Sequence, residues 1–155
     1  MSSNDISYYN GMGIQNFNAR QYTEAIVFFN KAIELAPNNP DYYHNRAECC
    51  RLSGQYEKAI SDYSFVLKSD SNDATVYYKR GICYNRTNSY QKALADFNNA
   101  IRLKPSIDED CYMCRAAAYC GVEDKDGAIK DLEYVLRLNP NQEVARAMLT
   151  QIRQL

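Results

Sequence analysis

The chain has 155 residues, of which 46% are apolar and 24% are charged. This balance is typical of a globular protein, and the length predicts a single domain over residues 1–155. Eighteen Lys and Arg residues against 19 Asp and Glu residues leave a net charge of −1. Such a charge creates no field that would gather the phosphates of nucleic acid, so we exclude a general nucleic-acid partner.

No segment has the composition of an export signal or a membrane span. The first ten residues, MSSNDISYYN, carry neither the basic nor the apolar region of a signal peptide, and no stretch approaches about 20 apolar residues. We therefore expect no direct membrane insertion and a cytoplasmic location. In that setting we interpret the six cysteines as reduced thiols.

A repeat of about 34 residues organises the chain. Ala25, Ala59, Ala93 and Ala128 are separated by 34, 34 and 35 residues, and one tyrosine series keeps the same spacing, namely Tyr9, Tyr43, Tyr77 and Tyr112. Positions within a copy are numbered as slots, and slot 1 of the first copy is Ile6. The third copy has one extra residue near Ser106. The four copies run over residues 6–39, 40–73, 74–108 and 109–142.

Each copy is predicted to be a hairpin of two helices. The first helix occupies roughly slots 2 to 14, and a polar turn such as Ser53-Gly54-Gln55 follows it. The second helix carries an apolar stripe at slots 20, 21, 24, 27 and 28, which follow helical spacing. Proline cannot continue a helix, so we expect the second helix to end at Pro37, Pro105 or Pro140 in three of the copies.

A single hairpin cannot bury its stripe, so the copies are expected to stack on one another. Slot 8 is always Gly or Ala, and slot 24 is a ring or Leu, which indicates that small and large side chains pack together. After the fourth copy, four apolar residues follow one another at helical spacings of 4, 4 and 3, namely Val144, Met148, Ile152 and Leu155. They predict an amphipathic ninth helix over about 141–155 that caps the stack.

The residue types at slots 4, 8, 20, 24, 27 and 32 resemble the tetratricopeptide repeat, or TPR. The resemblance covers residues 6–142. It implies an all-α fold, a right-handed superhelical α-solenoid of four helix-turn-helix hairpins with a ninth capping helix. Asn16 and Cys50 depart from the family, which often has Tyr at slot 11, Lys125 replaces the Tyr of slot 17, and Ser71 replaces a Pro.

Patterns that could indicate an enzyme or a metal site have structural explanations. The chain has one histidine, His44, and no strand-turn-helix element that would strain a serine nucleophile. Cys111 and Cys114 have metal-ligand spacing but lack two further ligands. The segment 122–133 resembles a calcium loop whose first position, Val122, offers no oxygen. We predict no enzyme activity, metal or cofactor, and an unusually reactive Cys120 or Cys111/Cys114 pair would be needed to overturn this.

The resemblance implies a concave groove lined by the first helices, which binds a peptide or helix of a partner protein. In this groove, amides can bind a peptide backbone, apolar residues can form pockets for the peptide's side chains, and cations can pair with its acidic groups. We therefore predict an adaptor or scaffold. The predicted groove residues are Asn10, Ile14, Phe17, His44, Asn45, Glu48, Arg51, Tyr78, Lys79, Ile82, Asn85, Arg86 and Met113, with Gly11, Cys114 and Ala117 at the same slots.

Two other functions stay open. In one, the chain is a co-chaperone that grips the acidic C-terminal tail of a heat-shock chaperone through a carboxylate clamp. Asn45 and Lys79 match two of the five clamp slots, whereas Asn10, Ile14 and Thr75 do not. In the other, the chain is a self-assembling structural repeat, although we expect a monomer.

Overall fold

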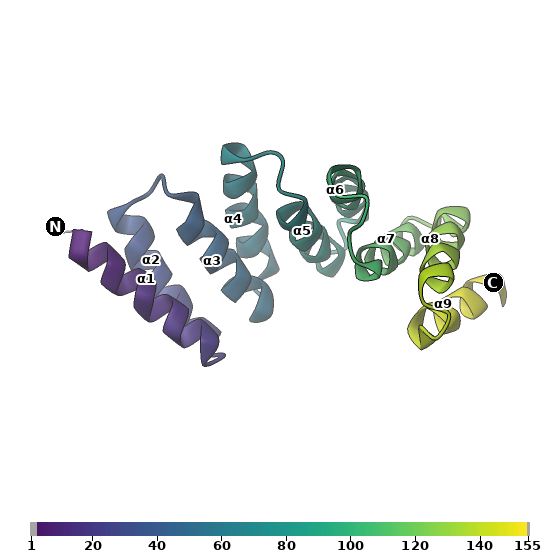
Figure 1. Ribbon diagram of the computed structural model, residues 1–155, viewed down its shortest axis with the longest axis horizontal. Helices are drawn as coiled ribbons and strands as arrows, with labels where there is room; N and C mark the ends of the chain where they lie inside the picture. The colour runs from purple at the N-terminus through teal and green to yellow at the C-terminus, as the bar shows by residue number, and fades with distance from the viewer. Residues whose placement is uncertain (1–2, 155) are drawn as a thin grey trace. The chain divides into compact units, whose positions relative to one another are not determined.

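The computed structural model describes residues 3–154. These residues form nine α-helices and no strand (Figure 1). Within the same range, no helix is long and apolar enough to cross a membrane. The helices are α1 (Ser3–Asn18), α2 (Tyr22–Leu35), α3 (Pro40–Leu52), α4 (Tyr56–Ser69), α5 (Ala74–Arg86), α6 (Tyr90–Leu103), α7 (Glu109–Gly121), α8 (Lys125–Leu138) and α9 (Glu143–Gln154).

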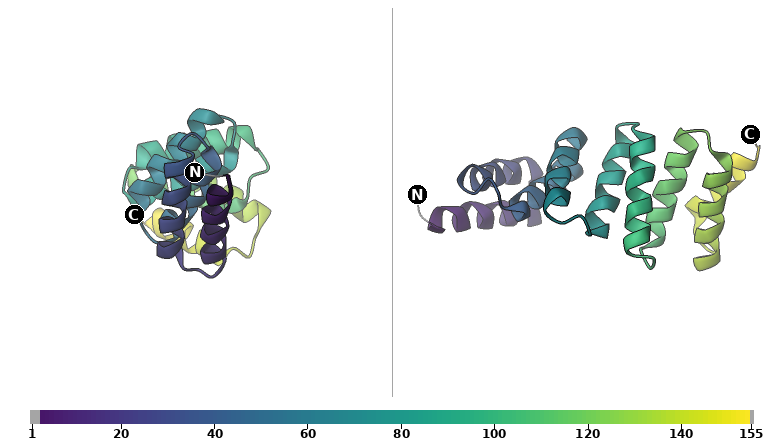
Figure 2. Two further views of the ribbon diagram at one scale, coloured as in Figure 1. Left: turned by 90° about the vertical axis from the view of Figure 1, so that its left-hand side faces the viewer. Right: turned by 90° about the horizontal axis from the view of Figure 1, so that it is seen from above.

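The described residues divide into two compact units. Unit 1 ends at Asn72 and contains α1 to α4, and unit 2 begins at Asp73 and contains α5 to α9. Within each unit, consecutive helices pack side by side as hairpins, α1 with α2 and α3 with α4 in unit 1, α5 with α6 and α7 with α8 in unit 2 (Figures 1 and 2). The predicted all-α hairpins and ninth helix are confirmed. The extra residue of the third copy lies in the loop between α6 and α7.

Helix starts and turns repeat with the sequence. A side-chain oxygen at slot 34 caps the next first helix by accepting a backbone N–H, as Asn39 does from Asp41 at 2.9 Å and Asp73 from Thr75 at 2.8 Å. Slot 15 turns every hairpin with a positive φ, although only one of its residues is a glycine. These residues are Arg20 (60°), Gly54 (78°), Asn88 (57°) and Glu123 (61°).

The small residues at slot 8 make room for the ring at slot 24. A Cβ on Gly13 would lie 2.5 Å from the Phe29 ring, and a Cβ on Gly81 would lie 2.8 Å from the Phe97 ring. Both rings are fully buried. A larger residue at either glycine would force the ring out of its place, which explains the pairing of small and large slots.

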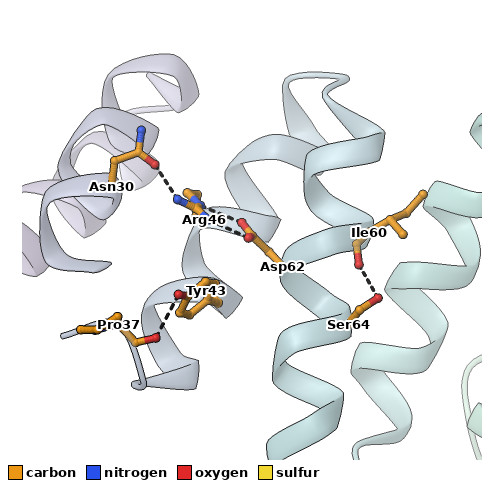
Figure 3. A network of polar contacts seen from close by, with 7 residues as sticks. All are labelled: Asn30, Pro37, Tyr43, Arg46, Ile60, Asp62 and Ser64. Atoms are coloured by element: carbon orange, nitrogen blue, oxygen red, sulfur yellow. Dashed lines mark hydrogen bonds and ion pairs between the residues drawn. The ribbon is translucent and has the colours of Figure 1, made fainter. Parts of the chain in front are cut away.

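A buried ion pair joins slots 7 and 23 in three of the four hairpins, and the sequence analysis missed it. In α3 and α4, the guanidinium of Arg46 donates two hydrogen bonds to Asp62, at 2.7 and 2.8 Å. Its third nitrogen donates to Asn30 of α2 at 2.7 Å, so one arginine ties two hairpins together (Figure 3). The other pairs are Arg80–Asp96 and Arg115–Asp131.

In unit 2 an arginine of the ion pair also forms a hydrogen bond to the preceding hairpin, as Arg46 does in unit 1. There the guanidinium of Arg115 also donates to Asn98 of α6 at 2.8 Å. The carboxylates are only 3–4% exposed, and burial raises the pKa of Asp96 although Arg80 opposes the rise. The first hairpin carries Met12 and Phe28 at these two slots, so this pair is not encoded there.

The ninth helix caps unit 2 with a different face from the one predicted. Val144 is 58% exposed, so its predicted burial is wrong, and Leu155 lies outside the described residues. The buried face consists of Ala145, Leu149 and Ile152, which pack against α8. These residues occupy slots 3, 7 and 10 when the numbering is continued from residue 143, and α9 places Leu149 at slot 7, where the three preceding copies have arginine.

Candidate functional site

The predicted groove residues fall into two sets, one in each unit. The unit 1 face is carried by α1 and α3 and the unit 2 face by α5 and α7. The unit 1 face comprises Asn10, Ile14, Phe17, His44, Asn45, Glu48 and Arg51. The unit 2 face comprises Tyr78, Lys79, Ile82, Asn85, Arg86 and Met113.

The unit 2 face contains a pocket of about 400 Å³ between α5 and α7. Four predicted residues line it, and its lining is mainly apolar with one cation, Arg86, which is exposed. Such a space suits an aliphatic side chain with an acidic neighbour. The lining residues are Ile82, Asn85, Arg86, Tyr90, Met113, Cys114 and Ala117.

Asn85 has a structural role beside its predicted one. Its Nδ2 donates to the backbone carbonyl of Cys114 at 2.8 Å and so holds α7 against α5. Among the described residues, its buried Oδ1 has no hydrogen-bond partner. The amide therefore fixes the floor of the pocket, and one of the two N–H groups on its Nδ2 is used within the chain.

Tyr78 packs more than the sequence predicted. Its ring is half-buried, and its centroid lies 6.3 Å from that of Phe97 in a tilted arrangement. Burial raises the pKa of its hydroxyl, and the thiol of Cys114 contributes to the rise. Tyr78 thus belongs partly to the core that supports the pocket.

The polar groups of the unit 1 face are engaged with one another. Asn45 donates from Nδ2 to Oδ1 of Asn10 at 3.5 Å. Arg51 donates from Nη2 to Oε2 of Glu48 at 3.1 Å, and the hydroxyl of Tyr63 donates to the other oxygen of the same carboxylate. The charge of Arg51, predicted to meet an acidic ligand, is therefore balanced within the chain.

The apolar and aromatic members of the unit 1 face have different surroundings. Ile14 is 42% exposed. The ring of Phe17 lies 5.8 Å from that of Tyr22, and the imidazole of His44 meets the ring of Tyr63 edge-on at 6.2 Å. His44 is thus an aromatic packing partner.

The other candidate chemical groups have structural surroundings. Cys111 is fully buried, and burial raises the pKa of its thiol to about 12. Cys120 is exposed, yet partial burial still raises its pKa. Asp124 caps α8 by accepting the N–H of Gly127 at 2.9 Å, so the resemblance to a calcium loop reflects a helix start. In the described part of the chain, no group of His, Cys, Asp and Glu could hold a metal ion.

Sequence reasoning missed Tyr90 as a pocket residue. Tyr90 stands at slot 17, where the family has Tyr, and it packs closely, since a Cβ on Gly121 would lie 2.5 Å from its ring. The same ring nevertheless forms part of the pocket wall. The signal was available in the sequence, because slot 17 follows directly after the turn and lies beside the end of the next first helix.

Family models of the tetratricopeptide repeat match four segments of the chain. They match residues 6–39, 28–61, 50–88 and 74–107, and the first of these ranges coincides with the first copy. The chain belongs to the tetratricopeptide-repeat family. Its fourth copy, beyond the matched residues, forms the hairpin α7 and α8 described above.

Solved structures resemble this TPR chain over most of its length. MamA from Desulfovibrio magneticus RS-1 is 19% identical, with a TM-score of 0.89, covering 98% of this chain and 85% of that chain. The first TPR domain of human RPAP3 is 28% identical, with a TM-score of 0.67, covering 77% and 93%. The first TPR of Spaghetti (RPAP3), solved with the HSP90 peptide SRMEEVD, is 28% identical at a TM-score of 0.67, covering 74% and 93%. No curated protein sequence matches the chain.

The TPR fold is that of a protein-interaction scaffold, and TPR proteins are in general non-catalytic. Which partner this chain takes is a separate question, because a shared fold does not carry a shared ligand.

Proposed function

We propose that this chain is a non-catalytic adaptor that binds an extended peptide of a partner protein, in the cytoplasm, through the pocket between α5 and α7. The pocket itself carries the proposal, since it joins apolar walls from Ile82 and Met113 to the cation of Arg86. The best ligand would place an aliphatic side chain between these walls and an acidic residue next to Arg86.

A random peptide library displayed on phage tests this proposal. The wild-type chain should enrich a motif with one aliphatic position and one acidic neighbour. Ala117→Arg should lose the enrichment, because Ala117 is exposed at the pocket and a long side chain would fill it. Ala95→Arg is the matched control, since Ala95 is exposed on α6 outside the pocket lining. Equal enrichment by both variants would reject the pocket as the site.

The chaperone-tail function is the second candidate. The likeness to the RPAP3 domain solved with the peptide SRMEEVD favours it, as do Asn45 and Lys79 at clamp slots. Against it, Ile14 and Thr75 supply neither charge nor amide, and Asn10 and Asn45 bind one another. Taking a carboxylate out of water needs convergent donors, so we expect weak binding of this peptide.

Titration with SRMEEVD separates the two candidates. If the clamp works, amidation of the peptide's C-terminus should weaken binding at least about tenfold, since a charged hydrogen bond contributes about 1.5–3 kcal/mol. Our first proposal expects the free and amidated peptides to bind within about twofold of each other.

We also propose that the chain is a monomer. The outward side of α9 is polar, with Arg146, Thr150, Gln151 and Gln154 around a shallow depression. A polar outer face does not favour the stacking of a second copy on this helix. Sedimentation at several protein concentrations should give one constant mass, and a mass that rises with concentration would support self-assembly instead.

A further inference from the structure

Both hairpins of unit 2 place an arginine between two tyrosine rings. In α5 and α6, Cζ of Arg80 lies 5.7 Å from the ring centres of both Tyr77 and Tyr84. In α7 and α8, Cζ of Arg115 lies 5.5 Å from the Tyr112 ring and 5.8 Å from the Tyr119 ring. A guanidinium is attracted to the face of an aromatic ring, so each arginine gains two such contacts.

The hairpin of α3 and α4 in unit 1 has the same arrangement with one ring missing. Arg46 lies 5.4 Å from the ring of Tyr43, which corresponds to Tyr77. The second ring is absent, because the residue that corresponds to Tyr84 one repeat of 34 residues earlier is Cys50. In unit 2 the ring of Tyr84 is also contacted by Lys92, and the residue that corresponds to Lys92 in unit 1 is again a lysine, Lys58.

A pocket of about 240 Å³ lies at this position in unit 1. Arg46 and Lys58, which correspond to the two cations around Tyr84, both line it. Lys92 shows the contact that Lys58 could make, with Nζ 5.7 Å from the Tyr84 ring. The lining residues are Ile26, Asn30, Arg46, Cys50, Lys58, Ser61 and Asp62.

We propose that this pocket, the Cys50 pocket, binds a small free phenol, whose ring takes the place that Tyr84 has in the next hairpin. The guanidinium of Arg46 is held in position by Asp62 and Asn30, so it presents a fixed surface to the ring (Figure 3). Ile26 lines the pocket as its apolar residue, and the fully buried Cys50 lies at its base. The polar side chains of Ser61 and Asn30 line the same pocket and suit the hydroxyl.

The chemistry follows from a general property of cavities. A space left by a missing apolar group binds a molecule that resembles that group, as an engineered cavity in a protein core binds benzene. Here the missing group is the side chain of tyrosine, and p-cresol is that side chain as a free molecule. The pocket lies on α2, α3 and α4 and shares no residue with the peptide pocket of unit 2.

Titration of the full chain with p-cresol, followed by amide chemical shifts, tests the proposal. The wild type should saturate at roughly millimolar concentration, as expected for a ligand of so few atoms. Cys50→Tyr should weaken binding at least about tenfold, because its own ring fills the space. Cys120→Tyr adds the same side chain at an exposed position and should leave binding unchanged.

A second pair of variants covers the case in which Cys50→Tyr does not fold. Lys58→Glu changes an exposed cation of the pocket and should weaken p-cresol binding about threefold. Lys68→Glu makes the same change on an exposed part of α4 outside the pocket lining, and binding should be unaffected.

Three results would overturn the proposal. The first is the absence of saturable p-cresol binding by the wild type. The second is binding that survives Cys50→Tyr or, where that variant does not fold, Lys58→Glu. The third is a tyrosine pentapeptide, Gly-Gly-Tyr-Gly-Gly, that binds at least about tenfold more tightly than p-cresol, which would assign the pocket to a protein side chain instead of a free phenol.

Discussion

Unit 1 and unit 2 use the same hairpin but stabilise it differently. Both hairpins of unit 2 have the Arg–Asp pair and the slot 11 tyrosine, and α9 covers the last one. In unit 1, the pair occurs once, at Arg46 and Asp62, and slot 11 holds Asn16 and Cys50. Because the stability of a repeat protein is approximately a sum over its hairpins and their contacts, we expect unit 2 to be the more stable.

Loss of a buried aspartate should have the largest effect on this difference. Asp131→Ala leaves Arg115 without its carboxylate and should lower the free energy of unfolding by about 3 kcal/mol. Asp126→Ala is the matched control on the same helix; Asp126 is exposed, so we expect a change within about 0.5 kcal/mol. Urea unfolding measures both. A loss below about 1 kcal/mol for Asp131→Ala would show that the pair does not stabilise unit 2.

Removal of a slot 11 ring should make unit 2 resemble unit 1. Tyr84→Cys abolishes the ring contacts with Arg80 and Lys92 and should cost about 2 kcal/mol of unfolding free energy. Tyr8→Cys, at a position 59% exposed, should cost less than about 0.5 kcal/mol. Equal effects in urea unfolding would contradict a stabilising role for the ring.

High pH should weaken unit 1 through its adjacent thiols. Burial raises the pKa of Cys49 to about 12 and that of Cys50 to about 11, whereas an unfolded thiol titrates near 8.5. Between these values the folded state holds protons that the unfolded state has lost. Stability is therefore retained below about pH 8.5 and falls above it, by about 1 kcal/mol per buried thiol over the first pH unit.

Unfolding curves at pH 8, 9 and 10 check this dependence. The double variant Cys49→Ala/Cys50→Ala should show a shallower loss than the wild type. Cys120→Ala, which removes an exposed thiol, should change the slope less. A double variant with the wild-type slope would show that these two thiols titrate alike in the folded and unfolded states.

Substitutions to glycine at slot 15 should have the smallest effect on the free energy of unfolding, and they should raise it instead of lowering it. Glu123 has a φ of 61°, which favours glycine, so Glu123→Gly should raise the free energy of unfolding by about 0.5–1 kcal/mol. Asn88→Gly, at a φ of 57°, should change it less, because asparagine tolerates this conformation. Thermal unfolding should thus rank Glu123→Gly above Asn88→Gly and above the wild type; the opposite order would contradict it.

The repeat made most of the fold predictable. Helix starts, turns and ends recur at fixed slots, so four copies of weak local signals reinforce one another. The α9 face was missed because helical spacing alone does not show which side of α9 faces α8, and slot 7, where the buried Leu149 stands, is arginine in the three preceding copies. The organisation of residues 1–155 as a single domain stays a prediction.

The site was less predictable than the fold. Slot numbers placed Ile82, Arg86 and Met113 at a common pocket, but they do not show which polar groups are already bonded. Asn85 and Arg51 both have partners within the chain that depend on neighbouring helices. The Arg–Asp pair is present in the sequence as an Arg and an Asp 16 positions apart in three copies. It was not predicted, because the hairpins were predicted from their apolar slots and not from their charged ones.

Binding of a partner peptide between α5 and α7 is the proposal on which the function of the chain depends. The direct measurement is the set of backbone amide shifts that change when a peptide selected by the wild-type chain is added. We predict that the largest changes centre on Ile82, Arg86, Met113 and Ala117, and that they vanish in Ala117→Arg. Changes that centre on α6 and α8 instead, or that persist in Ala117→Arg, would contradict the claim.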